Sequence, residues 1–220
     1  FKSIVVGRGM MGAAAARYLA LQGEGVAVIG PDEPTDWSNH HGVFASHYDE
    51  ARITRTIDSD PIWARLANRS IARYGEIAAE SGIDFYSEVG CLIVGPKRGG
   101  QDPYVGQVEA AARQLGVAVE MLSDAALKSR FRYFDFGSDC EGVYEEKNAG
   151  YVNPRRLVEA QSILAEVAGA KVVRRTAVSV REEGGLGIVA TDDGAVYTAE
   201  RVLVAAGGFS INESLLPRPV

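Results

Sequence analysis

Residues 4–12 read Ile4-Val5-Val6-Gly7-Arg8-Gly9-Met10-Met11-Gly12, a short apolar strand that runs into a glycine-rich turn. An alanine-rich helix follows, and a second apolar strand at residues 25–30 completes a β-α-β unit. In such a unit the first glycine permits a tight turn, the second lets a diphosphate approach, and the third lets helix and strand pack closely. The helix N-terminus adds N–H groups and a positive dipole end. The pattern predicts dinucleotide binding, although a glycine-rich turn also occurs in α/β domains that bind nothing.

The end of the second strand departs from this pattern. A dinucleotide site usually has an acid there, which accepts the adenosine ribose hydroxyls. Here the strand ends in Gly30-Pro31, and Asp32 and Glu33 come next. Asp32 reaches a ribose if the chain bends back at this point, and otherwise it is a solvated loop acid. Arg8, inside the glycine turn, has two similar interpretations: a phosphate contact or a solvent-facing side chain.

The composition excludes several classes of function. The chain has 220 residues, 46% hydrophobic and 24% charged, which is ordinary for one or two globular domains. Its net charge of -6 without a basic run argues against a nucleic-acid partner. Without a membrane-length apolar run or a signal-peptide pattern, we expect no membrane association and a cytoplasmic protein. Cys91 and Cys140 lack metal or redox spacing, and the adjacent His40-His41 pair has no third ligand in view, so we expect no metal.

The remaining chain alternates between helical and strand patterns. A long polar loop covers residues 31–46. The expected helices span residues 61–81, 104–115, 123–128 and 154–168. The expected strands cover residues 85–95 (split at Gly90), 117–121, 131–144, 170–173, 177–181, 186–191, 195–198 and 201–206.

Seven stretches, in this order, carry a resemblance to a known family: residues 7–12, 46–55, 67–70, 89–96, 150–154, 169–172 and 204–209. The chain resembles the glutathione-reductase-type FAD fold and, more narrowly, the monomeric sarcosine oxidase and N-methyltryptophan oxidase family of flavin amine oxidases. The resemblance implies an α/β fold with an FAD/NAD(P)-binding Rossmann-like domain, a β-meander and an inserted α+β substrate-binding lobe that is incomplete. The implied boundaries are 1–82 and 149–220 for the FAD-binding domain and 83–148 for the partial lobe.

The same resemblance implies FAD as the cofactor and suggests site residues. Arg52 would lie at the flavin ring, and Arg55 would clamp a substrate carboxylate, since a guanidinium pairs two oxygens at once. Alternatively, both arginines make surface ion pairs with acids such as Asp58. Tyr48, a third candidate catalytic residue, stands where closer relatives carry a histidine. The implied cofactor-binding residues are Gly7, Gly9, Met10, Met11, Gly12, Asp32, Ser46, His47, Arg52, Val178, Ala205, Ala206 and Gly207.

The implied reaction is FAD-dependent oxidation of the C–N bond of a secondary or N-methylated amine or amino acid. Oxygen would accept the electrons, and imine and hydrogen peroxide would form. Alternatives are a flavin dehydrogenase with another acceptor, an NAD-type oxidoreductase, or a non-catalytic FAD-binding subunit. The family's C-terminal half is expected in cis or on a second chain, and neither cysteine matches the flavin-attachment position. We further expect strand 201–206 to share a sheet with strand 3–7, and the inserted lobe to leave a sheet edge open.

Overall fold

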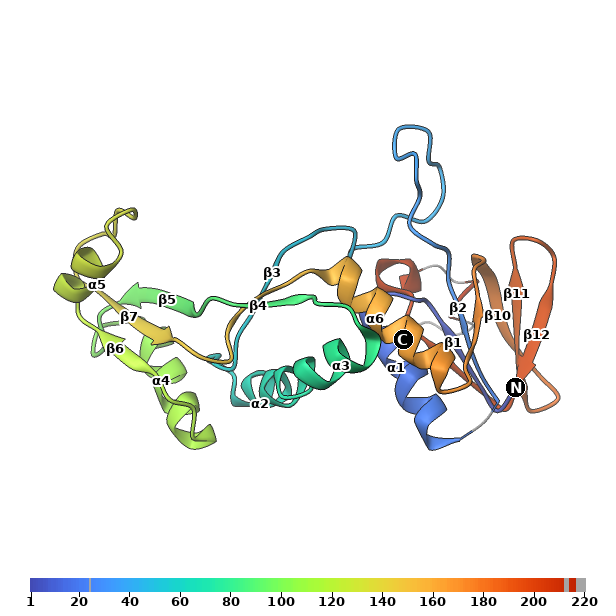
Figure 1. The fold of residues 1–220 in the computed structure, drawn as a ribbon, viewed down its shortest axis with the longest axis horizontal. Coiled ribbons are helices and arrows are strands. Elements are labelled where there is room, and N and C mark those ends of the chain that lie inside the picture. The colour runs from blue at the N-terminus through green and yellow to red at the C-terminus, as the bar shows by residue number, and fades with distance from the viewer. Residues whose placement is uncertain (24, 212–213, 217–220) are drawn as a thin grey trace. The chain divides into compact units, whose positions relative to one another are not determined.

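The computed structural model describes residues 1–23, 25–211 and 214–216. Its contacts divide the chain into two compact units, each assembled from separate segments (Figure 1). The first unit comprises Phe1–Glu50, Ile77–Phe85 and Asn153–Val220, and the second comprises Ala51–Glu76 and Tyr86–Val152. Residues 51–76 thus belong to the second unit, whereas the predicted boundaries placed them in the first segment of the FAD-binding domain, residues 1–82. The functional assignment of the predicted domains stays a prediction.

The first unit contains a four-stranded parallel sheet. Its strands are β1 (Ser3–Val6), β2 (Val26–Ile29), β9 (Lys171–Val173) and β13 (Arg201–Val204), in the order β13-β1-β2-β9. Val6 at the end of β1 is in register with Ile29 of β2 and with Val204 of β13, so the carboxyl ends of these strands meet at one edge. This confirms that the late strand shares a sheet with the first one, although it ends at Val204.

Both faces of this sheet are covered. On one face, α1 (Met10–Gln22) and α6 (Pro154–Val167) pack together, with Ala16, Ala20 and Ala165 in the core against Val5 and Val28. The small side chains on α1 let its backbone come close to the sheet, as the third glycine of the turn requires. On the other face, the core is formed by alternate strand residues and residues of the meander: Ile4, Val6, Ile29, Val180, Val189 and Ala199.

The meander is the predicted three-stranded antiparallel sheet. It consists of β10 (Ala177–Glu183), β11 (Leu186–Thr191) and β12 (Val196–Ala199). Gly184 and Gly185 form the first turn, with φ angles of 61° and 79°, which favour glycine. Hairpin signals in the sequence therefore located these strands to within two residues.

The second unit contains two three-stranded antiparallel sheets. One has the order β3 (Arg52–Thr54), β8 (Gly150–Val152), β4 (Tyr86–Glu88), and the other has the order β5 (Cys91–Pro96), β7 (Cys140–Glu145), β6 (Glu120–Leu122). Helices α2 (Pro61–Ile71), α4 (Tyr104–Leu115) and α5 (Asp124–Arg130) belong to the same unit. Its core gathers Ile57, Ile93, Val105, Val108, Ala112 and Val143. Within the described residues neither sheet closes on itself, as expected for the inserted lobe.

Three predicted elements were wrong in extent. The strand expected over residues 117–121 is β6, which covers only Glu120–Leu122. The helix expected over residues 61–81 is two helices, α2 and α3 (Tyr74–Ser81), because Arg73 donates its N–H to the Ser70 carbonyl and tightens the chain into a turn. The strand expected over residues 131–144 begins only at Cys140; Asp139, just before it, has a φ of 55°, which no strand adopts. No helix in the described ranges has the length and apolar character needed to cross a bilayer.

Candidate nucleotide-binding site

The glycine turn between β1 and α1 is packed too tightly for side chains. Gly7 has a φ of 103°, and a Cβ on it would lie 2.3 Å from the Ala205 carbonyl oxygen. A Cβ on Gly12 would lie 1.8 Å from the carbonyl oxygen of Gly7. Among the described residues here, Gly9 is the N-cap of α1 and makes no side-chain cap hydrogen bond, and the first turn of α1 contains no Asp or Glu. The turn therefore fits a diphosphate, which the N–H groups and the helix dipole would stabilise.

Besides the three glycines, four predicted cofactor residues lie at or near this turn. Met10 and Met11 begin α1, so their N–H groups are among those that have no acceptor within the helix. His47 comes from the loop: a Cβ on Gly9 would lie 3.4 Å from its Nδ1 atom. Ser46 is the exposed residue just before it. The structure thus brings a loop imidazole beside the second glycine, where a phosphate would approach; contact of these residues with a cofactor stays a prediction.

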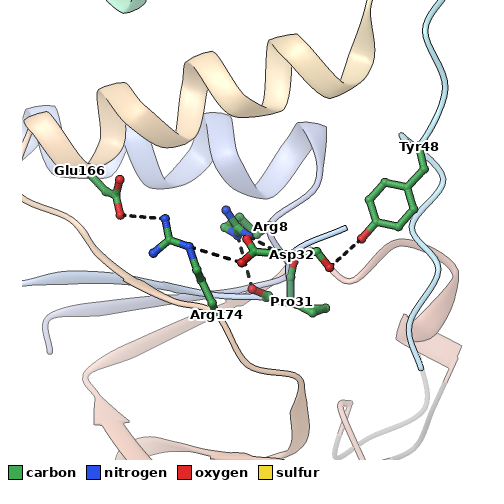
Figure 2. Close-up of polar contacts among 7 residues, drawn as sticks. Arg8, Pro31, Asp32, Tyr48, Glu166 and Arg174 are labelled. Atoms are coloured by element: carbon green, nitrogen blue, oxygen red, sulfur yellow. Dashed lines mark hydrogen bonds and ion pairs between the residues drawn. The ribbon is translucent and has the colours of Figure 1, made fainter. Parts of the chain in front are cut away.

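The end of β2 carries a cluster of charges (Figure 2). Arg8 makes an ion pair with Asp32 Oδ1, and its Nη2 also donates to the Pro31 carbonyl oxygen at 3.3 Å. Arg174, just after β9, reaches Asp32 Oδ2 with its Nε at 3.5 Å and Glu166 Oε1 with its Nη2 at 3.5 Å. Arg8 therefore does not face solvent, because its side chain is only 11% exposed and is paired with Asp32, whereas a contact of Arg8 with a phosphate stays a prediction.

Tyr48 lies on the loop side of the same cluster. Its hydroxyl donates to the Asp32 carbonyl oxygen at 3.4 Å, as Figure 2 shows. Burial, and secondarily the nearby Glu33 carboxylate, raises the pKa of Tyr48, so the phenol stays protonated at neutral pH. In this structure Tyr48 fixes the backbone that carries Asp32; its predicted catalytic role is untested.

One arginine ties the long loop to α6. Arg155 Nε donates to both Glu33 carboxylate oxygens at 2.9 Å, and Nη2 donates to the Tyr48 carbonyl oxygen at 2.8 Å. Its guanidinium also lies 5.2 Å from the ring centroid of Trp37. The Arg155 side chain thus contacts three residues spread along the loop: Glu33, Trp37 and Tyr48. Nothing in the sequence pattern marked this arginine, because its partners are far away along the chain.

Four more predicted cofactor residues belong to the first unit: Ala205, Ala206 and Gly207 follow the end of β13, and Val178 lies on β10. Ala205 donates its N–H to the Val6 carbonyl oxygen at 2.7 Å, which continues the sheet pairing to the edge of the glycine turn. Ala206 and Gly207 come next, where the chain enters a 3₁₀ turn (Gly207–Ile211). Val178 lies on β10 with its side chain 46% exposed. The small residues at 205–207 leave the backbone open to close approach.

Arg52 and Arg55 belong to the second unit. Arg52 begins β3 and is in register with Val152 of β8. Arg55 follows β3; its Nε donates to the Ile57 carbonyl oxygen at 2.9 Å and its Nη2 pairs with Asp58 Oδ2 at 2.7 Å. The ion-pair alternative from the sequence is therefore realised for Arg55 with Asp58. The roles of Arg52 at a flavin and of Arg55 at a substrate stay predictions.

A buried glutamate holds the turn after Arg55, and sequence reasoning did not single it out. Glu145 is 1% exposed and accepts the Thr56 N–H at 3.1 and 3.2 Å, together with the Thr56 hydroxyl. Burial raises the pKa of Glu145, and its hydrogen bonds from Thr56 oppose the rise. Cys91, opposite Glu145 in the β5–β7 register, has its thiol pKa raised by burial, so it is a weak nucleophile.

Comparison with known proteins decides the family. A family model described as FAD dependent oxidoreductase matches residues 2–220. The chain belongs to this family. The chain is 28% identical over 222 residues to monomeric sarcosine oxidase from Bacillus sp. (strain B-0618), covering 99% of this chain and 53% of that protein. It is 26% identical over 219 residues to N-methyl-L-tryptophan oxidase from Yersinia pestis (strain Pestoides F), covering 99% and 56%. The predicted family is confirmed, and the chain spans about half the length of these curated relatives.

Solved structures agree on the fold of this chain. Glycine oxidase from Geobacillus kaustophilus superposes with a TM-score of 0.74 at 21% identity, covering 99% of this chain and 57% of that one. L-proline dehydrogenase from P. horikoshii gives a TM-score of 0.74 at 19% identity, covering 96% and 54%. At these identities the likeness concerns the fold alone, and it confirms the predicted fold class.

Proposed function

We propose that this chain carries the FAD-binding part of an enzyme that oxidises the C–N bond of a secondary or N-methylated amine or amino acid. The observation that carries the proposal is the glycine turn, where a helix N-terminus without a side-chain cap and tight glycine packing fit a dinucleotide diphosphate in a chain of the FAD dependent oxidoreductase family. The names of two relatives, monomeric sarcosine oxidase and N-methyl-L-tryptophan oxidase, support the substrate class.

In this proposal the first unit binds and orients the cofactor. The N–H groups at the start of α1 would hold the diphosphate, and His47, which lies beside Gly9, would be its neighbour. Ala205, Ala206 and Gly207 would let the diphosphate approach the backbone, and the β10 backbone near Val178 would meet the adenine. When bound, FAD supplies the hydride-accepting chemistry, and the protein supplies orientation and electrostatics.

Substrate recognition is assigned to arginines of the second unit. Arg55 binds the substrate carboxylate, and Arg52 acts at the flavin ring. A guanidinium has five N–H donors. The contacts of Arg55 with Ile57 and Asp58 engage its Nε and Nη2 atoms, so donors remain for a carboxylate. The overall reaction takes a hydride and a proton from the CH–NH group and forms a C=N bond. Molecular oxygen accepts the two electrons with two protons and becomes hydrogen peroxide.

The test is a flavin absorption spectrum of the intact protein before and after acid precipitation, followed by oxygen consumption with N-methylated amino acids. Yellow FAD released into the supernatant, with peroxide formed in step with amine oxidation, supports the proposal. Turnover only with an artificial electron acceptor favours a flavin dehydrogenase. Bound FAD without turnover favours a non-catalytic subunit, and a colourless protein that binds NADH contradicts the FAD assignment.

A further inference from the structure

The strand end where a ribose-binding acid usually lies has no room for a side chain. A Cβ on Gly30 would lie 2.7 Å from both the backbone nitrogen and the Cβ of Arg8, closer than real Cβ contacts occur. Arg8 also fills the space beside Gly30, because its Nε donates to the Gly30 carbonyl oxygen at 3.4 Å. Arg8, inside the glycine turn, therefore excludes an Asp or Glu side chain at position 30.

The same arginine holds an acid two residues further on. One carboxylate oxygen of Asp32 pairs with Arg8 and the other pairs with Arg174 (Figure 2). The backbone carbonyl oxygen of Asp32 accepts a hydrogen bond from the Tyr48 hydroxyl. The Asp32 side chain is nevertheless 58% exposed, whereas that of Arg8 is 11% exposed. An ionised carboxylate has about four lone-pair sites. Asp32 is therefore fixed in orientation and still accessible to a further donor.

The charges of this cluster favour a neutral ligand group. Arg8 and Arg174 are balanced by Asp32 and Glu166, which pairs with Arg174. A ribose diol donates hydrogen bonds to a carboxylate, whereas a 2′-phosphate placed there would meet the Asp32 charge at close range, and Asp32 and Glu166 already balance the charge of both arginines.

We propose that Arg8 and Arg174 act as a clamp that presents Asp32 to the adenosine ribose, so that this site accepts a 2′-hydroxyl and rejects a 2′-phosphate. The inference rests on the proposed function, since it concerns the adenosine end of the same cofactor. Arg8 and Arg174 are positioning residues: they act through Asp32 and need not touch the nucleotide.

The test measures competition of ADP and of 2′-phospho-ADP against FAD on the cofactor-free form of the intact protein. The wild-type protein should prefer ADP by about tenfold or more. Asp32→Asn removes the repelling charge and leaves the arginines uncompensated. We expect it to lose about ten- to a hundredfold in ADP affinity and to prefer 2′-phospho-ADP.

Arg174→Gln should weaken ADP binding by about tenfold, and Arg8→Gln should do the same, because a loosened Asp32 is a poorer acceptor. The matched control is Arg175→Gln, the next residue, whose Nε pairs with Asp193 at 3.2 Å and which should bind ADP as the wild type does. Flavin mononucleotide lacks adenosine, so its binding distinguishes loss of the clamp from general damage to the site. Its affinity should not change in Arg8→Gln or Arg174→Gln.

Two results would overturn the clamp while leaving FAD binding intact. One is an Asp32→Asn protein with the wild-type preference between the two nucleotides. The other is a loss of flavin mononucleotide and ADP affinity in equal measure in both arginine variants. A wild-type protein that binds neither FAD nor ADP would overturn the proposed function as well as the clamp.

Discussion

Single residues of this protein owe their roles to neighbours that are distant in sequence. Glu145 is the clearest case, because its carboxylate is buried and its hydrogen-bond donors come from Thr56. On the same strand, Glu141 pairs with Arg98 Nε at 2.7 Å, and this hydrogen bond lowers the pKa of Glu141. Two glutamates of β7 thus have pKa values shifted in opposite directions, one by burial and one by a guanidinium.

The shift of Glu145 predicts how stability depends on pH. Its pKa is raised in the folded state, so between its unfolded value of about 4.3 and the raised value the folded protein binds more protons than the unfolded one. The free energy of unfolding therefore falls as pH rises through this window. We expect the wild type to lose stability relative to Glu145→Gln as pH rises, measured by urea unfolding over a pH series.

Glu141→Gln is the matched control, with the opposite sign. Because the folded pKa of Glu141 is lowered, the wild type should gain stability over this variant as pH rises toward 4.3 and keep the gain above it. Parallel pH profiles for the two variants would contradict the assignment of opposite shifts.

Arg55 carries a prediction about substrate charge. Removing a buried, charged partner of a carboxylate costs roughly 2–5 kcal/mol. In the intact protein, Arg55→Ala should therefore raise KM for carboxylate substrates by about two decades and leave uncharged amines little affected. Arg52→Ala should slow turnover of charged and uncharged amines alike. Steady-state kinetics on a matched pair of amines decides this, and equal losses for both amines in Arg55→Ala would refute the assignment.

At the scale of elements, the loop between β2 and β3 depends on one helix. Arg155 is in the first turn of α6, where a cation is not favoured by the helix dipole, yet it contacts Glu33, Tyr48 and Trp37 of the loop. Trp37 packs edge-on against Phe44 with ring centroids 5.3 Å apart, so the contact extends into the aromatic side chains of the loop. Arg155 of α6 therefore holds in place the loop that brings His47 to the glycine turn.

Arg155→Gln should release this loop. We expect cleavage within residues 31–50 by a dilute protease to become about tenfold faster, because several charge-assisted hydrogen bonds are lost at once. Arg156→Gln is the control, since Arg156 Nη1 donates to the Asp84 carbonyl oxygen and not to the loop. The contrary result is equal cleavage of the two variants.

At the scale of the whole molecule, local patterns predicted the first unit well. The β-α-β start, the meander hairpins and α6 follow from glycine positions and hydrophobic periodicity, which act over a few residues. The break between α2 and α3 carries no glycine or proline, so periodicity could not show it. Arg8, Arg174, Arg155 and Glu145 acquire their partners only through tertiary packing, and the sequence alone gave no means of pairing them.

The parallel sheet has a consequence for how the protein is made. β1 and β2 are synthesised before β13, and most of the helices and strands lie between β1 and β13 along the chain. Closing so long a loop is entropically costly and slow. Gly7 packs against the carbonyl of Ala205, which follows β13. The glycine turn therefore lacks this packing until β13 has joined the sheet. Until β13 is made, the glycine turn is therefore unfinished and one edge of β1 is unpaired, so we expect a cofactor to bind late in folding.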